Sequence, residues 1–359
     1  MTVWWKRLTA AVTVTVAATA GLTGPAGAAS ASNILYGVFP GYTSPASIAG
    51  WLGKTPAVQV NFHSFNPDDL NAARSDLTGA WNNGSVPLLT WELYLNSNTH
   101  TSTSSIDVSI TQGKYDGYIA QYADMLHTWA AGADGRYGTS DDRKLYLRFG
   151  HEMNGNWYPW SRSDRQSPAD YAAAWRRVHD AFTTHGLDSA HVQWMWIPMS
   201  CVSINGCGGG NAADYYPGSS YVDWAGVDAY NWGTAHSSGW QQPGTILDQA
   251  LRQVAAIAPG KPLAIPETGS SSSGGDKVQW MRDLGGFTSY FTAPGGERVK
   301  MLDYFNIDKE TDWAVLGGSG GDSTYQGMKT YSTFRGFIGS SNYVGASGHL
   351  TDAQFRGQL

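Results

Sequence analysis

The chain has 359 residues, of which 23 are basic and 29 acidic, so its formal net charge is -6. Charged residues make up 14% of it, against roughly 25% in an average globular protein, whereas hydrophobic residues make up 42% and aromatic residues 13%. Such a chain can bury a core, which excludes wholesale disorder, and its acidic balance without basic runs argues against a nucleic-acid partner. The surplus of aromatic side chains suits a neutral, hydroxyl-rich ligand, but an aromatic-rich core would give the same composition.

The first 31 residues have the pattern of a secretory signal peptide. Lys6 and Arg7 close a short positive segment, and the Ala- and Val-rich run Leu8–Leu22 follows it. Two sites of the A-x-A type come next, at residues 26–28 and 29–31. The apolar run is short for a membrane span, although a membrane anchor is the alternative. We therefore expect a secreted, extracellular protein with no membrane partner, whose single folded domain is residues 32–359.

Eight short runs rich in β-branched, aromatic or aliphatic residues predict strands. Most are continuously apolar rather than alternating, which is typical of parallel strands covered on both faces. In chain order they are Ile34–Phe39, Ala57–Phe62, Val86–Trp91, Leu145–Phe149, Val192–Ile197, Val222–Ala229, Pro262–Pro266 and Val299–Phe305. Between them, Pro or acidic residues in the first turn favour helices. These predicted helices are Asp68–Trp81, Tyr115–Ala131, Pro168–Phe182, Thr245–Ala258 and Asp276–Leu284.

This alternation of strands and helices predicts an α/β fold, a single (β/α)8 TIM barrel. Such a barrel needs about 250 residues, so the chain has room for loop insertions. The largest gaps between predicted elements are Leu93–Lys114 and Cys201–Tyr221. A doubly wound open sheet is the alternative fold.

Cys201 and Cys207 lie close together in the segment CVSINGCGGG. In an exported protein two free thiols would meet an oxidising environment, so we predict a disulfide between them. A loop this short gains little from loop closure, so the bond is expected to fix local shape more than it stabilises the fold.

Two glutamates stand where predicted strands end. Glu152 follows the fourth strand in RFGHE, and Glu267 follows the seventh in IPETG. The carboxyl ends of the strands carry the active site in barrels of this kind. Two carboxyl groups there suit glycoside hydrolysis, in which retaining enzymes hold an acid/base and a nucleophile about 5–5.5 Å apart. Each glutamate could instead be an exposed loop carboxylate or half of an ion pair.

The segment HEMNGNWYPW concentrates polar and aromatic residues around Glu152. Indole faces stack on sugar rings, although Trp is also ordinary core material. Together with YYPGSSYVDWAGVDAYNWG and IPETG, the segment resembles glycoside hydrolase family 26, a clan A family whose best-known members are β-mannanases. The likeness runs from about Leu145 to Trp313. It implies a (β/α)8 barrel, retaining chemistry, Glu152 as acid/base and Glu267 as nucleophile, in agreement with the argument from strand ends.

The resemblance also implies several substrate contacts. His151 resembles a histidine that hydrogen-bonds near the reaction centre, and Trp157 resembles a substrate-binding tryptophan. Tyr230 in VDAYNW resembles the tyrosine that hydrogen-bonds the nucleophile, and Trp313 in DKETDWA resembles a platform aromatic after the eighth strand. Core packing is the plain alternative for His151 and Trp313.

Selection among substrates depends on residues around the flanking subsites. We expect Trp91 and Trp232 to contribute there, with His63 and Glu92, although the sequence does not place them. The family likeness favours an endo-1,4-β-mannanase. An endo-β-1,3-1,4-glucanase and a β-1,3-xylanase are alternatives on the same frame, and a non-catalytic carbohydrate-binding barrel is an alternative of another class. The expected partner is a neutral polysaccharide, bound by a monomer.

We expect neither a cofactor nor a metal ion at the paired carboxylates. HEMNG lacks the second histidine of the zinc motif H-E-x-x-H, because position 155 is Gly155. A weak calcium candidate is the loop 133–142, with Asp134, Asp141 and Asp142 as oxygen ligands. The loop lacks the spacing of an EF-hand, so a solvated acidic turn is the other interpretation.

Overall fold

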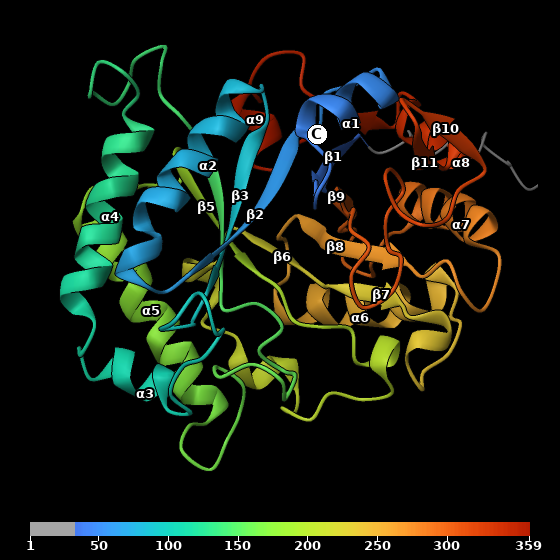
Figure 1. Cartoon of the computed structure of the whole chain (residues 1–359). Coiled ribbons are helices and arrows are strands. Elements are labelled where there is room, and N and C mark those ends of the chain that lie inside the picture. The colour runs from blue at the N-terminus through green and yellow to red at the C-terminus, as the bar shows by residue number, and fades with distance from the viewer. Residues whose placement is uncertain (1–32) are drawn as a thin grey trace, which may run out of the picture. The chain divides into compact units, whose positions relative to one another are not determined.

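Parallel strands close into a barrel in the computed structural model, which describes residues 33–359 (Figure 1). The barrel strands are β1 (Ile34–Phe39), β2 (Val58–Ser64), β3 (Val86–Glu92), β4 (Leu145–Phe149), β5 (Val192–Trp196), β6 (Trp224–Gly226), β7 (Ala229–Asn231), β8 (Leu263–Ser270) and β9 (Val299–Phe305). Because β9 pairs with β8 and also with β1, the sheet closes on itself. The predicted (β/α)8 barrel is confirmed, and an open doubly wound sheet is excluded. The predicted signal peptide, residues 1–31, lies outside the described residues and stays a prediction.

Helices surround the barrel (Figure 1). They are α1 (Pro45–Leu52), α2 (Leu70–Asn82), α3 (Ile106–Thr111), α4 (Asp116–Ala130), α5 (Pro168–Thr184), α6 (Pro243–Ile257), α7 (Lys277–Tyr290), α8 (Ser332–Ile338) and α9 (Asp352–Phe355). Short 3-10 turns are η1 (Pro67–Asp69), η2 (Cys201–Ile204), η3 (Ala212–Tyr215), η4 (Ser219–Tyr221) and η5 (Gly233–Ala235). β10 (Ser323–Tyr325) and β11 (Met328–Thr330) form a hairpin, and β12 (Tyr343–Val344) pairs with the first residues of β1.

The start of α5 shows how local sequence sets a helix boundary next to the barrel mouth. Ser167 accepts a hydrogen bond from the Asp170 amide at 3.3 Å, and Asp170 accepts one from the Ser167 amide at 2.7 Å. This reciprocal capping satisfies two amides that a helix start leaves unpaired, and Pro168 occupies the first turn, where it has no amide to lose. Four of the five predicted helices are present with bounds shifted by one or two residues, and the fifth, Asp276–Leu284, continues as α7 to Tyr290. The shorter α1, α3, α8 and α9 were not predicted.

The sixth strand position is divided. The predicted run Val222–Ala229 becomes β6 and β7, separated by Val227 and Asp228. β6 pairs with β5 and β8, whereas β7 pairs with β8 further along. Both residues of the break are buried, and the Asp228 carboxylate accepts a hydrogen bond from Arg148 at 2.8 Å in the barrel interior. The apolar run thus predicted the place of the strand but not the interruption that turns Asp228 inward.

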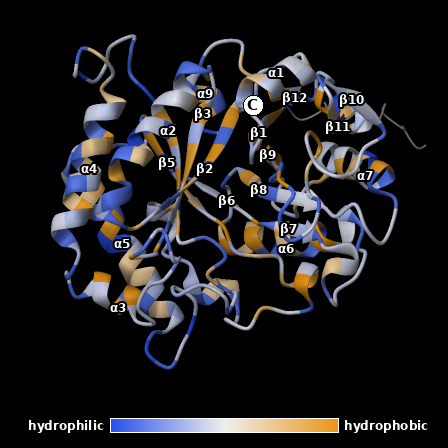
Figure 2. Ribbon diagram, viewed as in Figure 1, coloured by the Kyte–Doolittle hydropathy of each residue, from blue (hydrophilic) through white to orange (hydrophobic). Residues whose placement is uncertain are grey.

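Aromatic side chains fill much of the space between strands and helices. Hydrophobic residues concentrate along the barrel strands (Figure 2). Fully buried side chains include Trp91, Trp129, Trp160, Trp175, Trp196, Trp224, Trp280 and Trp313. The aromatic surplus noted in the composition is therefore mainly core material. Between residues 33 and 359 no helix is long and apolar enough to cross a lipid bilayer.

Candidate active site

A tight turn after β4 carries Glu152 into the mouth of the barrel. Gly150 has φ 51° and Glu152 has φ 52°, and this left-handed region costs a non-glycine residue roughly 1–2 kcal/mol. The Glu152 amide donates to the carbonyl of Ile197, just after the neighbouring strand β5, over 2.8 Å. Strain of this kind persists only where the surrounding structure enforces it, and it clusters at active sites.

The carboxyl group of Glu152 is shielded from water. Its side chain is buried, and Oε2 accepts a hydrogen bond from Trp157 Nε1 at 3.0 Å. Burial, and then the nearby charge of Glu267, raise the pKa of Glu152 to about 8. A carboxyl group that keeps its proton at neutral pH is suited to act as a general acid.

Glu267, near the end of β8, has strong donors on both oxygens. Tyr230 Oη donates to Oε2 at 2.6 Å, and the Arg148 guanidinium donates to Oε1. His151 Nε2 lies 3.9 Å from Oε1. Donors placed in this way match a carboxylate and fix its orientation, which is what a nucleophilic carboxylate needs.

Arg148, which the sequence analysis did not single out, connects several parts of the site. It is fully buried, its Nη1 donates to Asp228 Oδ2 at 2.8 Å, and its Nη2 donates to Thr90 Oγ1 at 2.7 Å as well as to Glu267. A buried arginine requires carboxylate partners because removing an unpaired charge from water is costly. An arginine inside the apolar strand LYLRF of a charge-poor chain was the signal that could have found this group.

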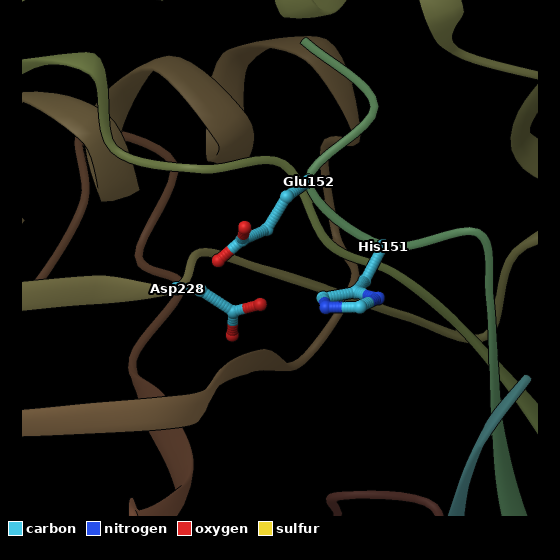
Figure 3. Close-up of side chains that lie close together, drawn as sticks. All are labelled: His151, Glu152 and Asp228. Carbon is cyan, nitrogen blue, oxygen red and sulfur yellow. The ribbon is translucent and has the colours of Figure 1, made fainter. Parts of the chain in front are cut away.

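His151, Glu152 and Asp228 converge in the barrel mouth (Figure 3). Each offers one ligand atom, and these atoms lie within 4.8 Å of one another, which makes this the one group of the described residues with the spacing of a metal site. Burial, and then the Arg148 charge, hold the pKa of His151 well below its usual range, so the ring is neutral. Its Nε2 lies 3.1 Å from Tyr158 Oη. Since Arg148 already places a positive charge against Asp228, the group is better suited to proton chemistry than to a cation.

A cavity of about 440 Å³ opens at this end of the barrel, and both Glu152 and Glu267 line it. Four of the aromatic residues expected to contact substrate also line it: Trp157, Tyr230, Trp232 and Trp313. Trp157 is 41% exposed and presents a free face, whereas Trp313 is 1% exposed and packs against Tyr230 and Trp232 with ring centres 4.9 Å apart in each case. The structure thus brings together the predicted carboxyl groups and most of the predicted aromatics.

Trp91, which we expected at a substrate subsite, belongs to the core instead. It is fully buried and stacks on Tyr122 of α4 at 4.1 Å between ring centres. His63, in register with it on β2, likewise points outward, to Asp69 and Asp76 on the α2 side. Side chains alternate along a strand, so the next residue on β3, Glu92, faces inward. Burial, and then the Glu267 charge, raise the pKa of Glu92 to about 7, and Glu92 is thus a third carboxyl group near Glu152 and Glu267.

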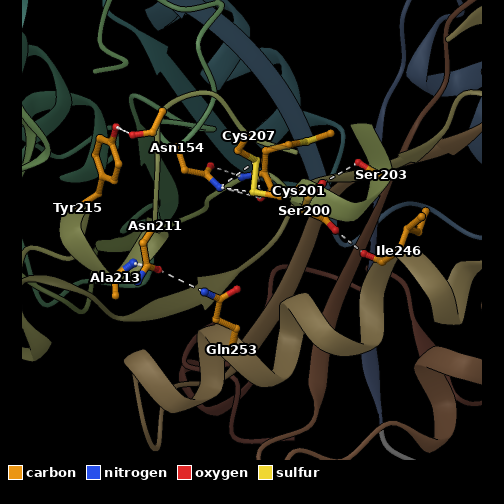
Figure 4. The surroundings of a disulfide bond; sticks show 12 residues. Asn154, Ser200, Cys201, Ser203, Cys207, Asn211, Ala213, Tyr215, Ile246 and Gln253 are labelled. Atoms are coloured by element: carbon orange, nitrogen blue, oxygen red, sulfur yellow. Dashed lines mark hydrogen bonds between the residues drawn. A yellow bond between two sulfur atoms is a disulfide. The ribbon is translucent and has the colours of Figure 1, made fainter. Parts of the chain in front are cut away.

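The predicted disulfide between Cys201 and Cys207 is present, with Cα atoms 4.9 Å apart (Figure 4). Asn154, from the turn after β4, donates from Nδ2 to the Met199 carbonyl at 2.9 Å and lies 3.3 Å and 3.4 Å from the two sulfur atoms. Ile204, inside the closed loop, lines the cavity. The disulfide therefore closes a small loop after β5, and Asn154 joins this loop to the turn that carries Glu152.

The calcium candidate is an internally hydrogen-bonded loop. Asp141 Oδ2 accepts from the amides of Ala133 and Asp134 at 2.5 Å and 3.1 Å, and Asp142 Oδ2 accepts from the amide of Gly138 at 2.7 Å. Of Asp134, Asp141 and Asp142, none belongs to the metal-spaced group found among residues 33–359. The loop is thus built as a turn in which the carboxylates cap backbone amides.

The amino-acid sequence is similar to a family of glycosidases and to individual members of known activity. The model of glycosyl hydrolase family 26 matches residues 69–293, more than half of the chain. Endoglucanase H of Acetivibrio thermocellus is 30% identical over 325 residues, which are 84% of this chain and 31% of that protein. Mannan endo-1,4-beta-mannosidase of Bacillus subtilis is 25% identical over 270 residues, which are 68% of this chain and 68% of that protein.

Solved structures with the same fold include two mannanases. The endo-beta-1,4-mannanase of Cellulomonas fimi superposes with a TM-score of 0.63 at 19% identity, over 89% of this chain and 73% of the other. The catalytic domain of the endo-beta-1,4-mannanase of Bacillus sp. JAMB-750 gives a TM-score of 0.64 at 17% identity, over 88% of each chain. At these identities the likeness shows the shared barrel fold alone.

Proposed function

Because the chain belongs to glycosyl hydrolase family 26, we propose that it is a secreted, retaining endo-1,4-β-mannanase. The observation that carries the proposal is the pair of glutamates in one cavity, Glu152 with a raised pKa and Glu267 held by Arg148 and Tyr230. A protonated acid and an ionised nucleophile are the two groups that retaining hydrolysis requires.

In the first step, Glu152 donates its proton to the glycosidic oxygen while Glu267 Oε2 or Oε1 attacks the anomeric carbon. The bond to the leaving sugar breaks, and a covalent glycosyl-enzyme forms. Tyr230 and Arg148 hold the Glu267 carboxylate in place for the attack. Trp157 orients the acid through its hydrogen bond to Oε2.

In the second step, Glu152 acts as a base. Once Glu267 is esterified, its negative charge is gone, and with it one of the causes that raise the pKa of Glu152. The pKa of Glu152 therefore falls when its proton has been given up, and its carboxylate can take a proton from water. The water oxygen attacks the anomeric carbon, Glu267 leaves as a carboxylate, and Glu152 is protonated again.

The substrate assignment rests on the relatives. Mannan is favoured because the Bacillus subtilis relative, matched over most of both chains, is a mannan endo-1,4-beta-mannosidase. A β-glucan is the second candidate, since Endoglucanase H has the higher identity and the larger share of this chain. The low charge of the chain suits either neutral polysaccharide.

A substrate panel tests the proposal. The purified protein is incubated with mannan, glucomannan, barley β-glucan and β-1,3-xylan, and reducing ends are measured over time. We expect mannan and glucomannan to be cleaved fastest, with a β-anomer as the first product by NMR. Cleavage of barley glucan alone would identify a glucanase, an α-anomer would exclude retention, and binding without new ends would indicate a carbohydrate-binding barrel.

Secretion has its own test. Protein recovered from the medium of the producing cells is sequenced from its amino terminus. We expect Ser32 as the first residue, after cleavage behind the second A-x-A site. An intact residue 1 in cell-associated protein would contradict it.

A further inference from the structure

A second hollow, which we call the flank groove, lies on the barrel wall between β1 and β2. It encloses about 640 Å³ and is lined by residues 39–45, residues 59–62 and one face of α2. β1 pairs with β2 only at Gly37 and Val38. The first residues of the same edge of β1, Ile34 and Leu35, pair with β12 instead. Beyond Val38 the two strands are no longer paired, which leaves room for the groove.

The β2 side of the groove carries amides where a barrel wall usually carries apolar side chains. Gln59 and Asn61 are in register with the outward positions Pro87 and Leu89 of β3, and each is 8% exposed. Gln59 Nε2 donates to Asn61 Oδ1 at 3.1 Å. Gln59 Oε1 is a buried acceptor that takes no hydrogen bond from any residue of 33–359. Buried polar groups usually have partners, so this acceptor indicates a donor from a ligand.

The rim of the groove carries an exposed aromatic ring. Tyr42 is 88% exposed and, with Trp157 and Tyr290, is one of the three exposed large hydrophobic side chains among the described residues. Trp157 is the tryptophan of the catalytic cavity. Stacking on a flat ring needs exposure of this kind, because the sugar covers the face that the protein leaves open.

Tyr42 stands on a fixed turn rather than a loose one. Gly41 has φ 58°, and a Cβ there would lie 2.2 Å from the Asn306 carbonyl oxygen. The Thr43 amide donates to the Pro40 carbonyl at 3.0 Å, and the Asn306 side chain donates to the same carbonyl at 3.3 Å. Because the backbone of this turn is already fixed, binding at Tyr42 does not have to order it.

The charge of the groove suits a neutral ligand. Asp76, the one ionisable acid in its lining, lies 3.4 Å from His63 Nε2. The groove and the catalytic cavity share an aromatic wall, since Phe39 stacks on Phe305 at 4.8 Å and Phe305 lines the cavity. A chain bound in the groove therefore lies beside the catalytic cavity without entering it.

We propose that the flank groove is a second binding site for the neutral polysaccharide. Tyr42 stacks on a pyranose ring, and Gln59 accepts a hydrogen bond from a sugar hydroxyl. The proposal rests on the proposed function for the class of ligand. The site would hold polymer near the catalytic cavity and would have little effect on short oligosaccharides that fill the cavity alone.

The test measures retention in native gels that contain soluble glucomannan. The Glu267→Gln protein is used, so that the polymer is not degraded, with and without Tyr42→Ala. We expect Tyr42→Ala to weaken the apparent affinity about three- to tenfold, the scale of one aromatic contact. Tyr290→Ala is the matched control, because it removes a tyrosine that is 75% exposed at the end of α7, and it should leave retention unchanged.

A second experiment measures steady-state kinetics in protein that keeps Glu267. Tyr42→Ala and Gln59→Met should each lower kcat/KM on the polymer several-fold and leave kcat/KM on a trisaccharide unchanged. Equal behaviour of Tyr42→Ala and Tyr290→Ala in both arms overturns the groove proposal. A lower kcat/KM on the trisaccharide would also overturn the proposal, because the defect would then lie in the catalytic cavity. If the unmodified enzyme cleaves no polymer of the panel, the proposed function fails, while retention in the gel still decides the groove.

Discussion

Glu152 and Glu267 are the same side chain in two different settings. Glu152 follows β4 on a strained turn and receives a hydrogen bond from the indole of Trp157, whereas Glu267 lies within strand β8 and receives hydrogen bonds from Arg148 and Tyr230. Burial dominates at the first residue, and it raises the pKa of Glu152 to about 8. Glu267 instead has a hydrogen-bond donor on each carboxylate oxygen. The difference teaches that two glutamates in one cavity are distinguished by their environment and not by their residue type.

The largest expected effect comes from removing each of the two glutamates in turn. Glu267→Ala should lower turnover by more than about 10⁴-fold, as removal of a nucleophile does in other hydrolases, and Glu152→Ala by about 10²–10⁴-fold. Added azide should enter the space left by Glu267 and give a glycosyl azide of inverted configuration, whereas with Glu152→Ala it should attack the glycosyl-enzyme and give the retained one. NMR of the azide product checks the assignment.

Glu310 provides the control for that experiment, since it also lines the cavity and is not one of the paired groups. Glu310→Ala should keep most of the turnover and form no glycosyl azide. The opposite stereochemistry of the two azides would exchange the roles of Glu152 and Glu267.

The second prediction concerns the donors on Glu267. Tyr230→Phe removes the hydrogen bond to Oε2 and should lower kcat about 10- to 100-fold with little change in KM, because the bond orients the attacking carboxylate rather than the sugar. Tyr304→Phe is the control, as its hydroxyl donates to the Trp313 carbonyl and not to a carboxylate. Steady-state kinetics on an aryl glycoside distinguish the two. A change confined to KM would place Tyr230 in binding alone.

The third prediction concerns pH. In the proposed mechanism, activity requires protonated Glu152, so kcat/KM should fall as pH rises through about 8, the raised pKa of this group. The Trp157 hydrogen bond favours the ionised form and lowers that pKa. Trp157→Phe should therefore move the alkaline limb to higher pH while it reduces the maximum. Trp232→Phe, which alters another aromatic of the same cavity, should leave the limb in place. A limb that moves to lower pH would contradict the assignment.

The smallest expected effect concerns how the Glu267 side of the site is supported. Lys277 Nζ donates to the carbonyls of Asp312, Trp313 and Ala314 at 2.8–2.9 Å, so it fixes the loop that carries Trp313 against Tyr230. Lys277→Met should raise KM a few-fold and lower Tm. Steady-state kinetics and thermal unfolding measure the two effects.

Lys54 is the matched control. Its Nζ donates to the carbonyls of Ile338, Ser340 and Tyr343 in the same three-way manner, at 2.7–3.1 Å, away from the cavity. Lys54→Met should lower Tm to a similar degree and leave KM unchanged. A KM change of equal size in both variants would show that stability alone accounts for it.

The sequence predicts the barrel well because buried parallel strands are continuous apolar runs. The bounds Ile34–Phe39, Leu145–Phe149 and Val299–Phe305 agree with the structure. The same property hides which side each residue faces. In Val86–Trp91 the run is apolar on both sides, so only the register reveals that Trp91 points to α4 and Glu92 to the catalytic pair.

Strand ends predict where the two glutamates lie because the carboxyl ends of the barrel strands meet at one mouth. Glu152 lies on the turn after β4 as expected, whereas Glu267 lies within β8 and not after it. Arg148 and Asp228 could not be placed in the same way, since their role depends on contacts across the barrel interior. The break at Asp228 also escapes a periodicity argument, because the residues on either side continue the apolar pattern. The sequence therefore does not predict the hydrogen bonds that Arg148 makes to Asp228 and Glu267 in the barrel interior.

Because the left-handed backbone at Glu152 is strained, the residues that suit folding best at this position differ from the one that the proposed activity needs. Asparagine and glycine adopt this conformation more easily than glutamate does, so either would relieve the strain while it removed the acid. We therefore expect a relative with Asn or Gly directly after the histidine of HEMNG to keep the barrel fold and to lack hydrolytic activity.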